Sequence, residues 1–190
     1  MDKIIRTKKE LKEWLDYETS RYKTKNLLDR ILNISEASLL RHHQILLRKT
    51  EYYYNTNKKL NYLVCKVKLG RFQKKYGISI PINTCGKGLQ IMHLGSVLIN
   101  DRVTIGENCK IHINTAVVAG GKNDDVPTIG NGVVISVGAV ILGGVDLADS
   151  IVIGANAVVN KSFDEPDITI AGVPSKKISN NGRSKWDRTK

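Results

Sequence analysis

Cysteines are scarce in this sequence and form no recognisable pattern. Cys65, Cys85 and Cys109 are odd in number and show no CxxC spacing, so no disulfide framework is indicated. The chain opens on the polar stretch MDKIIRTKKELKEWL instead of an apolar leader. We therefore expect a cytoplasmic protein with reduced thiols.

Long hydrophobic runs are also lacking. No segment approaches the roughly 18 to 20 consecutive apolar residues that a membrane-spanning helix needs. Any contact with a bilayer should therefore be peripheral, which leaves the inner face of the membrane as a possible location.

Charge is plentiful but unevenly distributed. Residues 1–76 carry 19 Lys and Arg against 8 Asp and Glu, residues 77–170 carry 5 against 9, and residues 171–190 carry 6 against 1. The basic ends are compatible with a solvated face, with attraction to anionic lipid or CoA phosphates, or with a nucleic-acid surface. No nucleic-acid-binding motif is recognisable, so we expect no nucleic-acid partner.

Residues 1–76 form the first of three predicted regions. Apolar residues recur there at helical spacing, as in Leu11, Trp14 and Leu15, which predicts amphipathic helices. A second set with this spacing is Leu27, Leu28, Ile31 and Leu32. Asn33, with Glu36 three residues later, is typical of a capping box, so we expect a helix to begin there. A further basic helix should end near Gly77.

Residues 77–170 repeat with a period of six. Ten of the eleven positions in this series are aliphatic, and Asn123 is the exception; the ten are Ile99, Ile105, Ile111, Val117, Ile129, Ile135, Ile141, Leu147, Ile153 and Val159. Such a period indicates short strands joined by tight corners, with one aliphatic side chain per strand in a narrow stacked core. Glycine and asparagine fall between these positions, where corners need positive φ. An ordinary β-sandwich would alternate every two residues instead.

The stretch AGGKNDDVPT at residues 119–128 lacks the aliphatic residue and should project as a loop. It is either a passive insertion or a carrier of binding groups. The predicted fold class is α+β, with a helical region at 1–76, a parallel β-helix at 77–170 and a basic C-terminal tail at 171–190.

Several motifs in residues 77–178 resemble the hexapeptide-repeat acyltransferases, specifically the serine acetyltransferase-like branch that includes sugar and polysaccharide O-acetyltransferases. They are GLQIMHLGSVLIND at 88–101, AVVAGG at 116–121, PTIG at 127–130 and AGVPSKKI at 171–178. The resemblance implies a left-handed β-helix, a homotrimer with active sites between subunits, and acetyl-CoA as co-substrate, without a metal.

By this resemblance, His93 matches the histidine that takes a proton from the acceptor hydroxyl. Its position six residues before Ile99 would equally suit a core side chain. Asp101 matches an acidic position near that histidine, although a solvated turn residue is the alternative. His112 lies nineteen residues after His93, so the two histidines should be close neighbours on successive coils, and His112 is the second candidate base.

The resemblance also assigns the donor site. A pantetheine chain needs small residues along its groove, and CoA phosphates need cations. The residues implied are Gly120, Gly121, Lys122, Val137, Gly138, Ala155, Asn156, Lys176 and Lys177. They are otherwise ordinary corner residues and solvated lysines.

Three departures bear on the acceptor. Met92, Ile78 and Val126 stand where serine acetyltransferase has an aspartate before the catalytic histidine, an upstream acidic residue that orients it, and a second histidine. Losing buried charge-assisted contacts of this kind costs about 2 to 5 kcal/mol each. These differences favour a sugar hydroxyl, in capsular or exopolysaccharide synthesis, over L-serine as the acceptor.

Two alternative functions outside acyl transfer are a metal-binding β-helix and a scaffold without catalysis. A three-histidine zinc site is hard to assemble, because only His93 and His112 lie in the repeat region. Failure to bind CoA would favour the scaffold.

Overall fold

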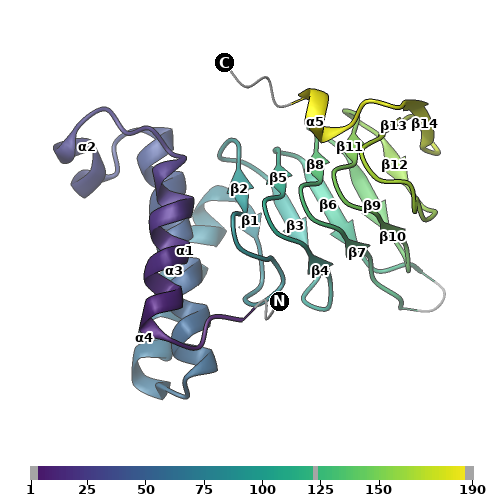
Figure 1. The fold of residues 1–190 in the computed structure, drawn as a ribbon. Coiled ribbons are helices and arrows are strands. Elements are labelled where there is room, and N and C mark those ends of the chain that lie inside the picture. Colours follow the sequence, from purple (N-terminus) through teal and green to yellow (C-terminus); the bar gives the residue numbers. More distant parts are fainter. Residues whose placement is uncertain (1–3, 122–123, 187–190) are drawn as a thin grey trace.

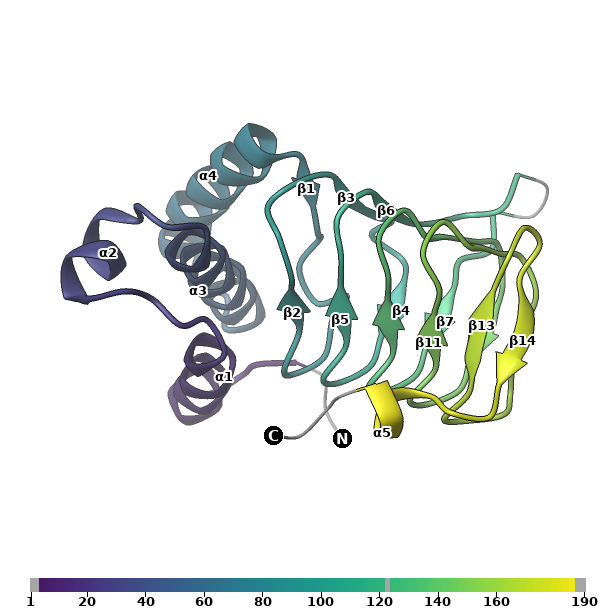
Figure 2. The ribbon, with the colours of Figure 1, turned by 90° about the horizontal axis from the view of Figure 1, so that it is seen from above.

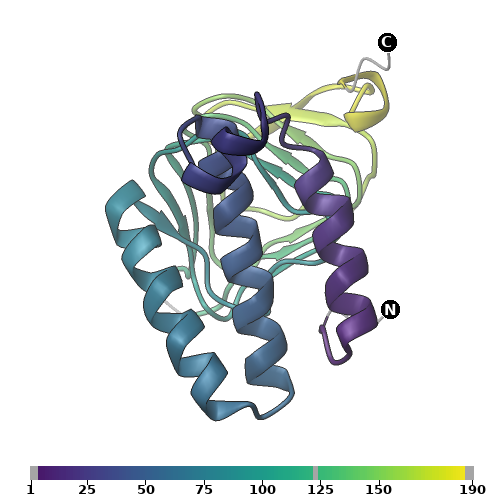
Figure 3. The same cartoon turned by 90° about the vertical axis from the view of Figure 1, so that its left-hand side faces the viewer.

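A computed structural model describes residues 4–121 and 124–186 (Figure 1). Its first part is helical and comprises α1 (Lys8–Ser20), α2 (Leu27–Leu32), α3 (Glu36–Asn55) and α4 (Lys59–Tyr76). The helix α3 packs between α1 and α4 (Figure 3). Polar side chains cap the first three helices, because Thr7, Asn26 and Ser35 each accept a backbone N–H of the first turn.

The strands in the described residues form three sheets, A, B and C. Sheet A contains β1 (Ile78–Ser79), β3 (Val97–Ile99), β6 (Thr115–Val118), β9 (Val140–Leu142) and β12 (Val158–Val159). Sheet B contains β4 (Thr104–Ile105), β7 (Thr128–Ile129) and β10 (Asp146–Leu147). Sheet C contains β2 (Gln90–Ile91), β5 (Lys110–Ile111), β8 (Val134–Ile135), β11 (Val152–Ile153), β13 (Thr169–Ala171) and β14 (Lys176–Ser179).

From β2 onward the chain visits sheets C, A and B in turn and then returns to C, which makes a parallel β-helix with three faces (Figure 2). We call the line of corners from sheet C to sheet A the C–A edge, and the line from sheet A to sheet B the A–B edge. The α+β class and the parallel β-helix are confirmed; its left-handedness stays a prediction.

The six-residue series forms the core as expected. All ten of its aliphatic residues are at most 4% exposed. Because this narrow core is closely packed, replacing a residue such as Ile135 with alanine should cost about 2 to 5 kcal/mol.

The loop between β6 and β7 preserves the period because it adds six residues. Eighteen positions separate the paired residues Val140 and Val158, whereas twenty-four separate the paired residues Ala116 and Val140. The predicted Lys122 and Asn123 of this loop lie outside the described residues.

The helical region closes one end of the β-helix (Figure 3). The buried Arg48 guanidinium pairs with Glu18 at 2.8 Å and Glu51 at 2.9 Å, and it donates to the carbonyls of Cys85 and Gly86. These carbonyls belong to the first coil, whose outer side has no further coil to pair with. The helices thus satisfy a strand edge that would otherwise be open.

Two expectations for the helical region were wrong. Helix α3 begins at Glu36 with Ser35 as its N-cap, whereas Asn33 ends α2 in the left-handed conformation with φ 52°. The side chain of Ser35 already holds the first turn of α3, which releases Glu36 for other contacts. The apolar residues of α2 form a helix as predicted, but they are exposed and do not join the core.

The region predicted as a basic tail contains regular structure. Strand β14 pairs antiparallel with β13 and extends sheet C, and a short helix, α5 (Arg183–Trp186), follows it (Figure 1). The backbone N–H of Arg183 donates to Ser150 at 2.9 Å, and Ser184 bonds to Asp167. These contacts hold α5 against the β-helix.

Candidate functional site

His93 lies on the C–A edge, in a corner that is longer than the one beside it. Ile91 pairs with Ile111 and Val97 pairs with Thr115, so six positions span the first corner and four span the second. The two additional residues push His93 outward, and its side chain is 58% exposed. This bulge explains why a residue in phase with the aliphatic series does not enter the core.

His112 occupies the shorter corner on the neighbouring coil. The imidazole rings of His93 and His112 have their centroids 6.5 Å apart. The structure therefore brings the two predicted histidines together, although the intervening coil has twenty residues instead of eighteen, as the pairing of Ile91 with Ile111 shows.

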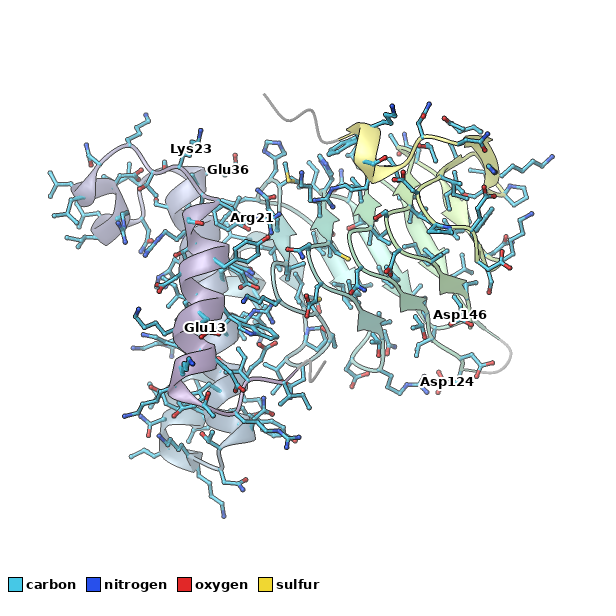
Figure 4. All side chains as sticks on the ribbon, viewed as in Figure 1. Glu13, Arg21, Lys23, Glu36, Asp124 and Asp146 are labelled. Carbon is cyan, nitrogen blue, oxygen red and sulfur yellow. The ribbon has the colours of Figure 1, made fainter. Side chains whose placement is uncertain are left out.

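Glu36, at the start of α3, reaches this corner from the helical region. One carboxylate oxygen accepts the backbone N–H of Leu94 at 2.8 Å, and the other lies 3.3 Å from Nδ1 of His93. A carboxylate facing Nδ1 favours the tautomer with its proton there, which leaves Nε2 able to accept a proton. Figure 4 shows Glu36 at the end of the helices that also carries Lys23.

A second group surrounds His112. Trp186 of α5 stands edge-on to the His112 ring, with centroids 6.2 Å apart, and Nζ of Lys110 lies 5.4 Å from the centre of the Trp186 ring. Nε2 of His112 is buried and has no hydrogen-bond partner among the described residues. Burial, with the charges of His93 and Lys110, lowers the pKa of His112 below its ordinary value. These surroundings thus favour the neutral form of the His112 ring.

Asp101 does not share this corner. It lies exposed in the turn between β3 and β4, on the A–B edge, whereas His93 precedes β3. Within one chain the structure does not bring Asp101 to the histidines, because the whole of β3 separates the two corners.

The predicted donor residues divide between the two edges. Val137, Gly138, Ala155 and Asn156 lie in C–A corners that follow the histidines along the same edge. Successive coils lie close together at these corners, because a Cβ on Gly138 would lie 2.0 Å from Oδ1 of Asn156 on the next coil.

Gly120 and Gly121 instead lie on the A–B edge. They line a depression of about 370 Å³ together with Asp125, Leu142, Gly143, Gly144 and Asn160.

The two predicted phosphate-binding lysines also differ. Lys176 is exposed at the start of β14, after the last C–A corner. The ammonium of Lys177 instead contacts both carboxylate oxygens of Glu165, at 2.5 and 2.6 Å. Lys177 therefore needs to leave this ion pair before it can meet a phosphate, whereas Lys176 is exposed to solvent. Lys122 lies outside the described residues.

Curated sequences and solved structures point to one kind of relative, although no family model matches the chain. A serine acetyltransferase of Buchnera aphidicola is 32% identical over 143 residues, which are 73% of this chain and 51% of that protein. One from Staphylococcus epidermidis is 36% identical over 110 residues, 56% of this chain and 51% of that protein. The chain thus spans about half the length of the curated relatives it matches.

Solved structures give the same fold. Serine acetyltransferase of Brucella abortus superposes with a TM-score of 0.68 at 21% identity, covering 93% of this chain and 72% of that one. The enzyme of Neisseria gonorrhoeae gives 0.67 at 23% identity, covering 97% and 73%. Together with the curated sequences, these likenesses support the broad hexapeptide-repeat acyltransferase family. A complex of the Brucella enzyme with coenzyme A superposes with a TM-score of 0.65 at 22% identity, covering 90% and 67%.

Sequence reasoning missed Glu36, Lys110 and Trp186. Glu36 lies 57 positions before His93 and was explained by helix capping, so nothing marked it as a partner of the corner. Trp186 follows the last recognisable motif, and only the return of α5 along sheet C brings it to His112.

In the described part of the chain, no group of three or more His, Cys, Asp and Glu side chains is arranged to hold a metal ion. Within the same residues, no helix is both long and apolar enough to cross a membrane.

Proposed function

We propose that this chain transfers an acetyl group from acetyl-CoA to a hydroxyl, with His93 as the general base. The observation that carries the proposal is the exposed imidazole of His93, whose Nδ1 faces Glu36 at 3.3 Å while Nε2 is left to accept a proton. A carboxylate that orients a catalytic imidazole in this way is a recurrent device in acyl transfer.

The proposed reaction is a direct transfer. The acceptor oxygen attacks the thioester carbonyl carbon while Nε2 of His93 takes the hydroxyl proton. The C–S bond then breaks, and the imidazolium returns the proton to the departing CoA sulfur. No acyl-enzyme on cysteine is proposed, because Cys85 and Cys109 are buried in the core and Cys65 lies on α4, whereas the histidines lie in corners of the β-helix.

The donor proposal rests on the complex of the Brucella relative with coenzyme A and on the C–A edge of this chain. The small corner residues Gly138 and Ala155 permit close approach of a pantetheine chain, and Lys176 at the end of the edge offers a cation for a phosphate. These residues, with the histidines, form one continuous line.

L-Serine is the acceptor that the comparisons favour, since the curated relatives are named serine acetyltransferases. Met92, Ile78 and Val126 replace three polar groups of serine acetyltransferase, one of which is an acidic residue that orients the histidine. Glu36 supplies a carboxylate at that corner from a different element, and Lys110 adds a cation beside His112. Charges of both signs suit a zwitterionic acceptor, so we rank L-serine first.

A sugar hydroxyl is the second candidate. Met92 and Val126 still stand where the resemblance implies an aspartate and a histidine, so the grip on an amino acid is weaker than in that family. A neutral hydroxyl does not need those groups.

We also propose a homotrimer. The histidines lie on the C–A edge and the Gly120 depression on the A–B edge, so one chain cannot bring them together. A neighbouring copy that sets its A–B edge against this C–A edge would complete a groove. Light scattering on the purified chain should give a mass three times that of 21.1 kDa; a monomer would contradict this assembly.

Release of free thiol from acetyl-CoA tests the proposed reaction. We expect release that depends on a hydroxyl acceptor and that is lost in His93→Ala. Saturable release with L-serine supports the first acceptor, whereas release only with a nucleotide sugar supports the second. Absence of CoA binding, together with no release for any hydroxyl acceptor, would overturn the enzymatic proposal.

A further inference from the structure

The segment between α1 and α3 displays apolar side chains to solvent. Helix α2 stands away from the β-helix at one end of α3 (Figures 1 and 3). Four side chains of α2 and that of Ile34, which follows it, are between 63% and 69% exposed, and we call them the α2 tip: Leu27, Leu28, Ile31, Leu32 and Ile34. So many large aliphatic side chains in one short segment are unusual on a free surface.

Local hydrogen bonds explain why these aliphatic side chains are exposed. The carboxylate of Asp29 points inward and accepts the backbone N–H of Ser35 at 2.7 Å, its hydroxyl at 2.7 Å, and the hydroxyl of Ser38 at 2.9 Å. The backbone N–H of Lys25 donates to it at 3.0 Å. The Ser35 and Lys25 hydrogen bonds hold the pKa of Asp29 well below its ordinary value. The acidic side chain of α2 is therefore buried, whereas the aliphatic side chains are exposed.

Basic residues lie close to the α2 tip in the sequence. Lys23, Lys25 and Arg30 are exposed, and the acidic residue of residues 21–34 is the buried Asp29. Arg30 and Arg41 line one depression of about 350 Å³, whose lining also includes Asp16. Asp16 already pairs with Lys12 at 3.3 Å. Cations therefore outnumber carboxylates beside the tip, where Glu36 is the partly exposed acidic group that follows it.

We propose that the α2 tip docks on an anionic lipid bilayer. Aliphatic side chains in a rim of Lys and Arg are the combination that binds the interface of a membrane, where apolar groups enter the acyl boundary and cations meet lipid phosphates. Contact between the tips of two copies is less suitable, because it would bring their cations together; contact of the tip with another face of a second copy is an outcome that the light scattering below detects. The proposal does not depend on the acetyl transfer.

Docking would place the candidate site close to the lipid surface. Glu36 follows Ile34 by two residues, and it contacts the His93 corner. Figure 4 shows Glu36 and Lys23 at the same end of the helices. An acceptor delivered at the membrane surface would thus meet the histidines.

Vesicle flotation of the full chain tests the docking. We expect the protein to float with vesicles of phosphatidylglycerol and phosphatidylcholine, and about tenfold less with phosphatidylcholine alone, because the cations need anionic lipid. Leu28→Ser with Ile31→Ser should reduce the bound fraction about tenfold by removing apolar contact. Lys23→Gln with Lys25→Gln should also weaken binding and reduce its sensitivity to salt.

The matched control is Leu60→Ser with Leu63→Ser on α4. These residues are 76% and 57% exposed, and they follow the far end of α3, a helix of 20 residues. We expect this control to float like the parent.

Loss of flotation in the control as well, or no flotation of the parent on anionic vesicles, would overturn the proposal. If the tip variant has a lower mass than the parent by light scattering, the tip is an interface between copies and the proposal is wrong. Neither readout uses acetyl-CoA, so a failure here is distinct from a failure of the proposed function.

Discussion

Glu36 contacts two consecutive residues of the histidine corner, because one carboxylate oxygen accepts the Leu94 N–H at 2.8 Å and the other faces His93 Nδ1 at 3.3 Å. The contact joins the start of α3 to the longest corner on the C–A edge. It is the reason that we propose His93, and not His112, as the base.

Replacing Glu36 with glutamine tests it as a positioning residue. The amide retains an oxygen for Leu94 but can present an N–H to Nδ1, which favours the tautomer that carries its proton on Nε2. We expect kcat to fall about 10²-fold, with the KM for acetyl-CoA within about twofold of the parent. If Glu36→Gln and Glu36→Ala lower kcat by the same factor as each other, and also lower thermal stability by the same amount, the role of Glu36 is structural instead.

Trp186 should act on the acceptor and not on the donor. It borders His112 at 6.2 Å and is 41% exposed, so a bound acceptor can reach its ring. We expect Trp186→Ala to raise the KM for the acceptor about tenfold and Trp186→Phe to raise it less. Acceptor binding should also change tryptophan fluorescence in the parent and not in Trp186→Phe, where the buried Trp14 remains; an unchanged KM would exclude the contact.

Thiol labelling checks that cysteine takes no part in the reaction. Burial raises the pKa of Cys85 to about 11 and that of Cys109 to about 12, so both thiols stay protonated at neutral pH. We expect iodoacetamide to modify Cys65, which is partly exposed, and to leave acetyl transfer unchanged. Rapid labelling of Cys85 in the folded protein, accompanied by loss of activity, would contradict the direct mechanism.

His43 should make stability depend on pH. Burial in the helical region lowers its pKa to about 4, below the 6.5 of an ordinary histidine. As the pH falls, His43 therefore binds a proton in the unfolded chain before it does so in the folded one. The free energy of unfolding should be highest above about pH 6.5 and should fall by about 3 kcal/mol towards pH 4.

Urea unfolding at pH 7.5 and pH 5 measures this dependence. We expect His43→Gln to lose part of the difference in unfolding free energy between the two pH values. The matched variant His93→Gln, at an exposed position, should keep the difference seen in the parent. If His43→Gln keeps it in full, other groups account for the acid sensitivity.

The sequence predicted the β-helix well because its core repeats. Each of the ten aliphatic positions satisfies the same local requirement, so the period is visible without knowledge of distant contacts. The loop between β6 and β7 adds six residues to its coil and so even conserved the phase.

The candidate site was harder to predict for two physical reasons. The corner between Ile91 and Val97 is two residues longer than the next one, which moves His93 to the surface although it is in phase with the core series. The partners of the histidines arrive from the two ends of the chain, Glu36 from α3 and Trp186 from α5. Contacts over such separations depend on how whole elements pack, and local patterns do not encode them.

The most direct test compares His93→Ala and His112→Ala with the parent for acceptor-dependent thiol release from acetyl-CoA, after light scattering has shown that all three have the same mass. We expect His93→Ala to lose about 10² to 10⁴ of kcat, with CoA binding retained, and His112→Ala to lose less. Activity of His93→Ala within about tenfold of the parent would contradict the account and make His112 the better base.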